Sequence, residues 1–417
     1  MPVLYRRPGQ VCVEHTIEVP LDHDDPAGPT IELFAREVAR PDGADLPLLL
    51  FLQGGPGYAA TWPSSSAAWL GQALKEFRVV LLDPRGTGRS TPANRQSLRG
   101  TADPAAYLSR FRADSIVRDA ELVRARLGGG KPWSVLGQSY GGFCALTYLS
   151  LVPEGLREVM IGGGLPALDG GPDPIYRAAF PRAIEATERF YARYPGDRAI
   201  ARRVADHLAE TDVRLPGGDR LTPERFQLLG LALGTSGTED LPHHLLEVAF
   251  TGGELSDVFL RGVDTAVSMA TRPLYALLHE SIYCQDAASA WSAHRVRGEF
   301  DKFDTAGGGD VLFTAEMIEP WLFEQDPALA PLRDSAQRLA EHRWSTLYDP
   351  ARLAANDVPV AAAVYLDDLY VDAAASLRTA EQVRGLRVWA TADHAHNGLS
   401  ADPTVFDRLL GMVRGEV

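Results

Sequence analysis

The sequence is poor in cysteine and in positive charge, and each shortage excludes a class of protein. Among its 417 residues are 3 cysteines, Cys12, Cys144 and Cys284, which are too few and too scattered for a disulfide framework or a metal knuckle. The 41 Lys and Arg residues are outnumbered by 55 Asp and Glu residues, which leaves a net charge of −14 at pH 7. So acidic a chain is not expected to bind nucleic acid through a broad basic surface.

Long hydrophobic runs are lacking as well. No uninterrupted apolar stretch is long enough to cross a membrane, and residues 1–7 lack the apolar region of a signal peptide. We therefore expect no membrane partner and a cytoplasmic protein. The histidines lack a metal-ligand spacing such as H-E-x-x-H, so neither a metal nor an organic cofactor is expected.

What the sequence does contain is a regular succession of short apolar runs. Six strands are predicted in the first part of the chain, at residues 16–20, 30–35, 47–52, 77–82, 133–136 and 159–162. The first two alternate apolar with polar residues and are predicted to pair antiparallel, whereas the next two are continuously apolar, as in strands buried on both faces. An amphipathic helix is predicted around residues 115–123. This succession favours an α/β fold with a mostly parallel central sheet flanked by helices.

Helical periodicity replaces the strand pattern in the middle of the chain. Helices are predicted there at residues 178–194, 223–233 and 242–250. Strands return at residues 358–366 and 386–390, and a closing helix is predicted at 403–414. The sequence therefore predicts a core domain in two parts, residues 1–165 and 346–417, with a mainly helical cap domain, residues 166–345, inserted after the sixth strand.

Residues 137–142, Gly-Gln-Ser-Tyr-Gly-Gly, lie between a predicted strand and a predicted helix. A G-x-S-x-G turn in this context is typical of the nucleophile elbow of an α/β hydrolase. The turn is so tight that Ser139 needs strained backbone angles, and the glycines leave room for the chain to pass itself. Ser139 is therefore the candidate nucleophile, and Cys144, in the helix that follows, is predicted to be a core residue.

Glycines also follow the predicted strand 47–52, at the end where open α/β sheets bind their ligands. In the segment Gln53-Gly-Gly-Pro-Gly57 the backbone N–H groups are free to approach an oxyanion. We expect an N–H near Gly55 and the N–H of Tyr140 to form an oxyanion hole.

A serine nucleophile needs a base and an acid, and in this fold they follow the serine in the order acid, then histidine. Asp367 and Asp368 come after the predicted strand 358–366, and His394 and His396 come after the predicted strand 386–390. Both pairs sit just past strand ends, and position alone does not choose within either pair. His342 is predicted to lie outside the site.

Three motifs together resemble the proline iminopeptidase family of serine α/β hydrolases. Residues 53–57 are similar to its H-G-G-P-G loop, residues 83–90 to its D-Q-R-G-x-G-R-S segment, and residues 137–142 to its elbow. Gln53 and Pro84 depart from the family pattern, at positions outside the triad. The resemblance implies an α/β-hydrolase fold and hydrolysis of an N-terminal residue, typically proline, from a peptide.

The same resemblance narrows the choice of site residues. It favours Asp368 as the acid and His396 as the base, and it implies that two glutamates of the cap bind the free amino group of the substrate. Glu280 and Glu316 are the best matches for those glutamates. Arg85, in the second motif, is expected to anchor the loops beside the elbow.

Two other functions fit the sequence less well. An esterase or lactonase would use the same triad, since ester and amide hydrolysis share this chemistry, and it would be indifferent to N-acylation of its substrate. A non-catalytic binding protein on the same fold usually loses members of the triad, whereas here all three roles have candidates. The predicted partner is therefore a peptide or small molecule with a free N-terminus.

Overall fold

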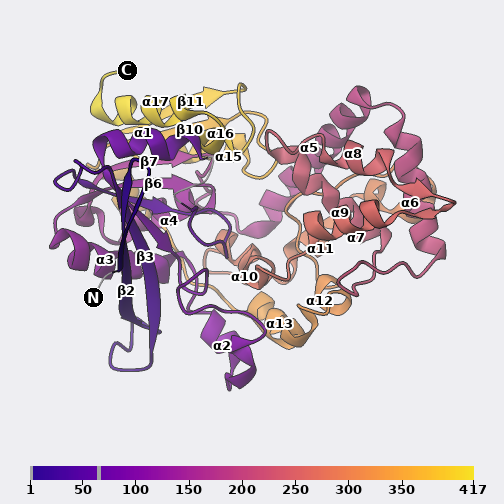
Figure 1. Cartoon of the computed structure of the whole chain (residues 1–417), viewed down its shortest axis with the longest axis horizontal. Coiled ribbons are helices and arrows are strands. Elements are labelled where there is room, and N and C mark those ends of the chain that lie inside the picture. The colour runs from indigo at the N-terminus through magenta and orange to yellow at the C-terminus, as the bar shows by residue number, and fades with distance from the viewer. Residues whose placement is uncertain (1–2, 63–66) are drawn as a thin grey trace.

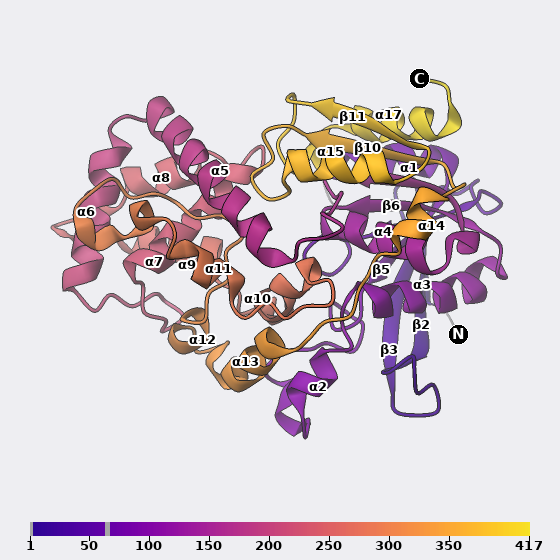
Figure 2. The same cartoon turned by 180° about the vertical axis from the view of Figure 1, so that it is seen from behind.

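The structure is a computed structural model and describes residues 3–62 and 67–417. It has two lobes (Figure 1): a sheet lobe, built around a nine-stranded sheet, and a helical lobe, built from the segment between β7 and β10. Figure 2 shows the same division from behind, and in both views α10 lies between the lobes.

The strands of the sheet follow the order β1-β2-β3-β5-β4-β6-β7-β10-β11. Their bounds are β1 Val3–Arg7, β2 Gln10–Pro20, β3 Thr30–Ala39, β4 Leu48–Leu52, β5 Arg78–Asp83, β6 Trp133–Gln138, β7 Leu156–Gly162, β10 Val360–Tyr365 and β11 Leu386–Thr391. The pairs from β1 to β5 are antiparallel, and the pairs from β5 through β4, β6, β7 and β10 to β11 are parallel. The predicted mostly parallel sheet is therefore confirmed.

One strand, β1, is absent from the sequence prediction. Its side chains are exposed or half-buried, so it carries no apolar run and no clear alternation. Because β1 precedes the six predicted strands, the helical segment follows the seventh strand of the chain and not the sixth.

Helices cover both faces of the sheet. Helices α1 (Ala68–Glu76) and α17 (Pro403–Arg414) pack on one face, and their apolar residues share one buried cluster with the strands. Helices α3 (Ala113–Gly128), α4 (Tyr140–Leu151) and α15 (Ala373–Gln382) contribute to a second cluster. Cys144 is buried in α4, as predicted for a core residue. Two covered faces explain why the parallel strands are continuously apolar.

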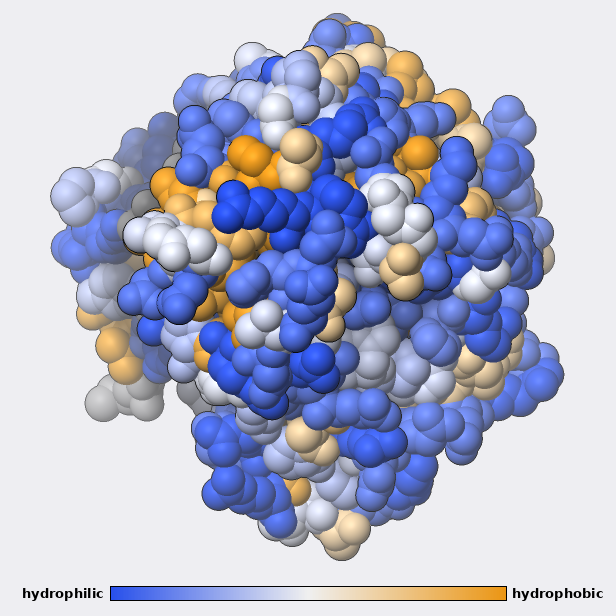
Figure 3. All heavy atoms as spheres, turned by 90° about the vertical axis from the view of Figure 1, so that its right-hand side faces the viewer, coloured by the Kyte–Doolittle hydropathy of each residue, from blue (hydrophilic) through white to orange (hydrophobic). Residues whose placement is uncertain are grey.

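The helical lobe contains α5 Pro172–Arg193, α6 Asp197–Glu210, α7 Pro223–Gln227, α8 Leu241–Glu247, α9 Asp257–Val267, α10 Pro273–Leu278, α11 Ser292–Arg297, α12 Leu322–Gln325 and α13 Arg333–Glu341. Shorter helices, α2 Pro104–Leu108, α14 Pro350–Ala354 and α16 Gly398–Ala401, belong to the connections of the sheet lobe. None of the helices in the described part of the chain is both long and apolar enough to cross a membrane. The end of the molecule that carries α6 is largely hydrophilic, with smaller apolar areas between the polar side chains (Figure 3).

The predicted helix at 223–233 is only partly correct. It is α-helical to Gln227 and then continues as a 3-10 segment, Leu228–Gly234. Gly230 lies so close to the neighbouring chain that a Cβ there would be 2.1 Å from the carbonyl oxygen of Thr314. The change from α-helix to 3-10 helix occurs where Gly230 meets Thr314. The periodicity of the local sequence does not reveal this contact between distant segments. The helical lobe also contains a short antiparallel hairpin of two strands, β8 Phe250–Thr251 and β9 Glu254–Leu255.

Arg85 anchors the segments around the second motif, as expected. Its side chain is buried and forms a bidentate pair with Asp119 of α3, with N–O distances of 2.7 and 2.6 Å. The same guanidinium donates to the carbonyl oxygens of Pro20, Leu21 and Arg110. One buried cation thus fastens the end of β2 and the start of α3 to the loop after β5.

We expect Arg85→Met to lower the free energy of unfolding by about 3–5 kcal/mol, because it leaves the carboxylate of Asp119 buried without its cation. Urea titration followed by fluorescence measures the loss. The matched control is Arg118→Gln, which removes an exposed pair with Asp24 and should cost less than about 1 kcal/mol. Equal losses in the two variants would contradict the anchoring role.

Candidate active site

Ser139 stands at the junction of β6 and α4 with a strained backbone. Its φ is 54° and its ψ is −124°, in a region that non-glycine residues rarely adopt. Its N–H donates to the carbonyl oxygen of Gly162 at 3.0 Å. A Cβ on Gly141 would lie 1.9 Å from the carbonyl oxygen of Leu52, and one on Gly164 would lie 2.3 Å from that of Ser139. Only glycine fits at these two positions, so the elbow geometry expected from the motif is present.

Asp368 and His396 come from the loops after two adjacent strands, β10 and β11, and meet there. Oδ2 of Asp368 lies 2.8 Å from Nδ1 of His396, and both side chains are buried. The other carboxylate oxygen, Oδ1, accepts from the N–H groups of Tyr370 at 2.9 Å and Val371 at 3.0 Å. The acid is therefore held by the backbone on one side and faces the imidazole on the other.

The alternative acid and base lie elsewhere. Asp367 is exposed, and His394 packs near Trp389 and lies 3.8 Å from Asp402. His342, predicted to lie outside the site, is exposed and directly follows α13. The structure thus brings together Asp368 and His396 and leaves the other members of both pairs apart.

Ser139 and His396 both lie beside the end of β7. Gly162, which accepts from the N–H of Ser139, ends β7, and a Cβ on the following Gly163 would lie 3.3 Å from the carbonyl oxygen of His396. The helical lobe approaches the same loop, because the N–H of His396 donates to the carbonyl oxygen of Gly234 at 3.2 Å. The candidate base therefore lies where the elbow, the sheet and the helical lobe meet.

The surroundings of His396 set its proton affinity. Burial by itself lowers the pKa of this imidazole, but the charge of Asp368 and the hydrogen bond to it outweigh burial, and the carboxylate of Glu316 adds to them. The pKa of His396 is consequently raised above the ordinary value of a histidine. An imidazole of raised pKa is a stronger base once it is neutral.

The two segments predicted to supply the oxyanion hole lie beside the serine. A Cβ on Gly54 would lie 3.0 Å from Cβ of Ser139 and 3.6 Å from its Oγ, so the backbone after β4 runs directly beside the nucleophile. Gly55 follows with φ of 132°, a conformation suited to glycine. Tyr140 opens α4, where backbone N–H groups are not used within the helix. Donation by Gly55 and Tyr140 to an oxyanion stays a prediction.

Glu316 lies in a cavity between the lobes. Its Oε1 accepts from the hydroxyl of Tyr275 at 2.8 Å, and its charge raises the pKa of His396. Glu316, Tyr275, Tyr58 and Tyr370 line a cavity of about 300 Å³. The ring of Tyr370 packs edge-on against that of His396, with centroids 4.8 Å apart. This arrangement places one of the two predicted glutamates beside the candidate base.

Glu280 is placed differently. It is buried, and its two oxygens accept from the N–H groups of Ser292 at 3.1 Å and Ala293 at 2.8 Å, at the start of α11. Burial raises the pKa of this carboxyl, although the two N–H groups act in the opposite direction. Both oxygens of Glu280 therefore already accept hydrogen bonds within the protein. A carboxylate that binds the substrate is expected to have an oxygen free for the ammonium group.

The sequence analysis did not single out the aromatic contacts between the elbow helix and the helical lobe. Phe143 of α4 contacts Tyr283, with ring centroids 5.9 Å apart, and Tyr283 contacts both Tyr176 and His279. His279 is buried, and neither ring nitrogen has a hydrogen-bond partner among the described residues. His279 and Tyr283 are four residues apart in a helical segment, a spacing that places both rings on one face. This spacing is the signal in the sequence from which the contact could have been predicted.

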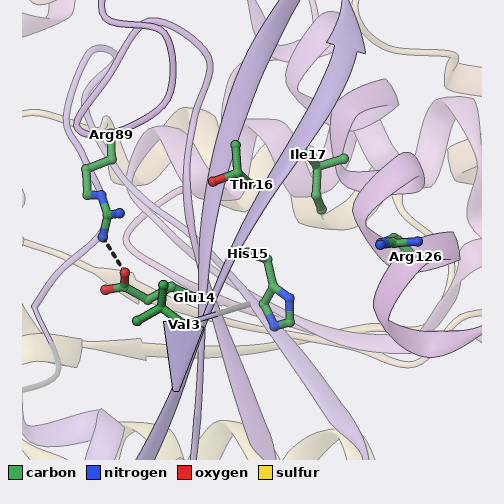
Figure 4. Close-up of a pocket in the computed structure, with 7 residues that line it drawn as sticks. All are labelled: Val3, Glu14, His15, Thr16, Ile17, Arg89 and Arg126. Carbon is green, nitrogen blue, oxygen red and sulfur yellow. Dashed lines mark ion pairs between the residues drawn. The ribbon is translucent and has the colours of Figure 1, made fainter. Parts of the chain in front are cut away.

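Two other features are separate from this site. Figure 4 shows a hollow beside β2, with Val3, Glu14, His15, Thr16, Ile17, Arg89 and Arg126 around it. Three strands of the sheet separate β2 from β6 and its elbow. Among the described residues, His243, His244 and Glu247 of α8 are close enough together to hold a metal ion, but His243 is already bonded to Asp197. Neither feature contributes a group to the chemistry at Ser139.

The family model that describes the alpha/beta hydrolase fold matches residues 47–220. A solved structure of 2-hydroxy-6-oxo-6-phenylhexa-2,4-dienoate hydrolase from a Rhodococcus strain aligns with 96% of this chain and 99% of its own, at 14% identity and a TM-score of 0.46. The matched segment contains β4, β5, the elbow and β7. The match to the family model, together with the mostly parallel sheet flanked by helices, confirms the α/β-hydrolase fold predicted from the sequence.

Two relatives are similar over almost their whole length. The proline iminopeptidase of Aeromonas sobria is 49% identical over 420 residues, which is 99% of this chain and 99% of that protein. The proline iminopeptidase aneH of Aspergillus aculeatus is 38% identical over 395 residues, which is 90% of this chain and 87% of that protein. The chain belongs to the proline iminopeptidase family of α/β hydrolases.

Proposed function

We propose that this protein is a serine aminopeptidase that releases an N-terminal residue, preferentially proline, from peptides through an acyl-enzyme. The observation that carries the proposal is the 2.8 Å contact between Asp368 and His396 beside the strained elbow of Ser139. The names of the two full-length relatives support proline as the preferred residue.

In the proposed mechanism His396 takes the proton of the Ser139 hydroxyl. Because Nδ1 of His396 is occupied by Asp368, Nε2 is the nitrogen that is free to act as the base. The oxygen of Ser139 attacks the carbonyl carbon of the first residue, and the imidazolium then gives its proton to the departing amine. Water, deprotonated by the same imidazole, hydrolyses the acyl-enzyme and releases the first residue.

The negative charge that develops on the carbonyl oxygen is assigned to two backbone donors, the N–H groups of Gly55 and Tyr140. The N–H of Tyr140 belongs to the first turn of α4, whose dipole favours a negative charge at that end. Removal of one such donor typically costs about 3 kcal/mol of transition-state stabilisation.

The free amino group of the substrate is assigned chiefly to Glu316, with Glu280 as the second predicted carboxylate. Tyr275 occupies Oε1 of Glu316 and leaves Oε2 for an ammonium group. A buried cation without a partner is costly, so a site built around such a carboxylate rejects peptides whose N-terminus is blocked. We assign both glutamates to a cap domain at residues 166–345, inserted into a core formed by residues 1–165 and 346–417.

An esterase or lactonase is the second candidate. The cavity beside Glu316 has apolar walls from Leu228, Leu229, Leu231 and Ala232, which suit the acyl group of an ester as well as a prolyl ring. The two functions differ in one requirement, a free amino group on the substrate.

A cytoplasmic location is part of the proposal. The three cysteines are free and buried, which suits a compartment that keeps thiols reduced. The acidic net charge of −14 supports a peptide substrate over a nucleic acid.

The first test is a panel of aminoacyl-β-naphthylamides, free and N-acetylated. We expect rapid release from free Pro-β-naphthylamide, none from its acetylated form, and a loss of at least about 10⁴-fold in kcat/KM in Ser139→Ala. Ser109→Ala, which removes an exposed hydroxyl that donates to the carbonyl oxygen of Ala106 in α2, is the matched control and should keep full activity. Full turnover by Ser139→Ala would sink the proposal, and indifference to acetylation with rapid cleavage of simple esters would favour the esterase.

A second test separates the two glutamates. Glu316→Gln should lower kcat/KM on Pro-β-naphthylamide by about 10- to 100-fold, because it removes a charge-assisted contact to the ammonium group. Glu280→Gln should chiefly lower stability, by about 1–3 kcal/mol, because an amide nitrogen then faces a backbone N–H of α11. Steady-state kinetics and thermal unfolding on both variants check this, and the reverse order of effects would assign the amino group to Glu280.

A third test uses pH. His396 must be neutral to accept a proton, so kcat/KM should fall as the pH drops through its raised pKa. Asp368→Asn removes the two contributions of Asp368 that raise this pKa and leaves burial and the smaller effect of Glu316. The acid limb of the pH profile should therefore move to lower pH while the maximal rate also falls. His394→Ala should leave the limb unchanged. A limb that follows His394 instead would reject His396 as the base.

A further inference from the structure

Arg272 stands at the junction of two cavities beside the candidate site. One is the cavity of about 300 Å³ that also contains Glu316. The other, of about 420 Å³, is lined by the loop after β4, the second motif and the start of α10. Arg272 and Tyr58 line both cavities, so together they form the wall between them.

The guanidinium of Arg272 makes no ion pair within residues 3–62 and 67–417, and its Nε is buried there without a hydrogen-bond partner. The side chain is nevertheless positioned, because the guanidinium carbon lies 5.2 Å from the centroid of the Tyr58 ring. The backbone is also fixed, because the N–H of Arg272 donates to the carbonyl oxygen of Met269. Several other arginines of the helical lobe form ion pairs, as Arg338 does with Asp103. A positioned, unpaired guanidinium on a cavity wall indicates a site for an anion.

The opposite charge lies in the same cavity. Glu316 bonds to Tyr275, whose ring packs edge-on against Tyr58 at 5.7 Å, and Tyr58 in turn lies under Arg272. Tyr275 and Tyr58 therefore link the two charged side chains by a chain of contacts, and all four residues line the same cavity. The ammonium and the carboxylate of a short peptide lie only a few extended residues apart, at roughly 3.5 Å per residue, so its two ends match two opposite charges in one cavity.

We propose that Arg272 binds the C-terminal carboxylate of short peptide substrates, which makes this protein selective for di- and tripeptides with a free C-terminus. The inference rests on the proposed aminopeptidase function and adds its substrate class. A guanidinium presents paired N–H donors that match a carboxylate, and the ring of Tyr58 below it holds the plane of the donors in place. The leaving residue of the peptide would then occupy the junction of the two cavities.

The test compares peptides that differ only in the C-terminal charge. Release of proline from Pro-Ala and Pro-Ala-Ala is measured against release from the corresponding C-terminal amides. The wild-type protein should favour the free acid by about tenfold in kcat/KM for at least one length, chiefly through KM. In Arg272→Met the acid and the amide should be cleaved at equal rates, and Arg272→Lys should keep part of the preference.

Pro-β-naphthylamide, which has no carboxylate, is the internal control. Its kcat/KM should stay within about twofold in Arg272→Met, which shows that the variant is folded and that catalysis is intact. Arg343→Met removes an equal charge from an exposed pair with Asp286 and should keep the wild-type preference. Equal rates on acid and amide in the wild-type protein, or a preference that survives in Arg272→Met, would overturn the inference. Failure of the wild-type protein to cleave Pro-β-naphthylamide would instead reject the proposed function.

Discussion

The site depends on one constraint, the strained backbone of Ser139. A non-glycine residue in such a conformation costs on the order of 1–3 kcal/mol, and it persists only where its surroundings over-determine it. Here the carbonyl oxygens of Leu52 and of Ser139 itself fill the space in which side chains at Gly141 and Gly164 would lie. The close approach of β4, β6 and the segment after β7 thus fixes the elbow. The same approach brings the Gly54 backbone against the serine.

The strands and the elbow could be predicted from the sequence because their signals are local. Continuous apolar runs mark strands covered on both faces, and the G-x-S-x-G turn carries its own geometric requirement. Strand β1 was not predicted, because its side chains are exposed or half-buried and show no apolar pattern. Its pairing with β2 is visible only in the folded structure. The helix after Gln227 was predicted in the wrong form for a similar reason, since the close approach of Gly230 to Thr314 joins segments about 80 residues apart.

The site residues were predictable to different extents. The positions after β10 and β11 gave two candidates for each role, and the family resemblance favoured Asp368 and His396, the pair that the structure brings into contact. The glutamates were harder, because the partners of a carboxylate depend on segments that the sequence does not place. Glu280 meets the start of α11, whereas Glu316 meets a tyrosine of α10. Nothing in the local sequence marks Arg272 as a binding residue, because the absence of an ion-pair partner among the described residues becomes visible only in the folded structure.

The hydrogen bond from His396 to Gly234 has a consequence for the durability of the enzyme. The loop of the candidate base follows β11 of the sheet and is bonded to the helical lobe, and the neighbouring Asn397 exchanges two further hydrogen bonds with the backbone of Ser236. Separation of the lobes would release this loop while the sheet stays intact. We therefore expect heating to inactivate the protein by separating the helical lobe from this loop, before the sheet itself unfolds.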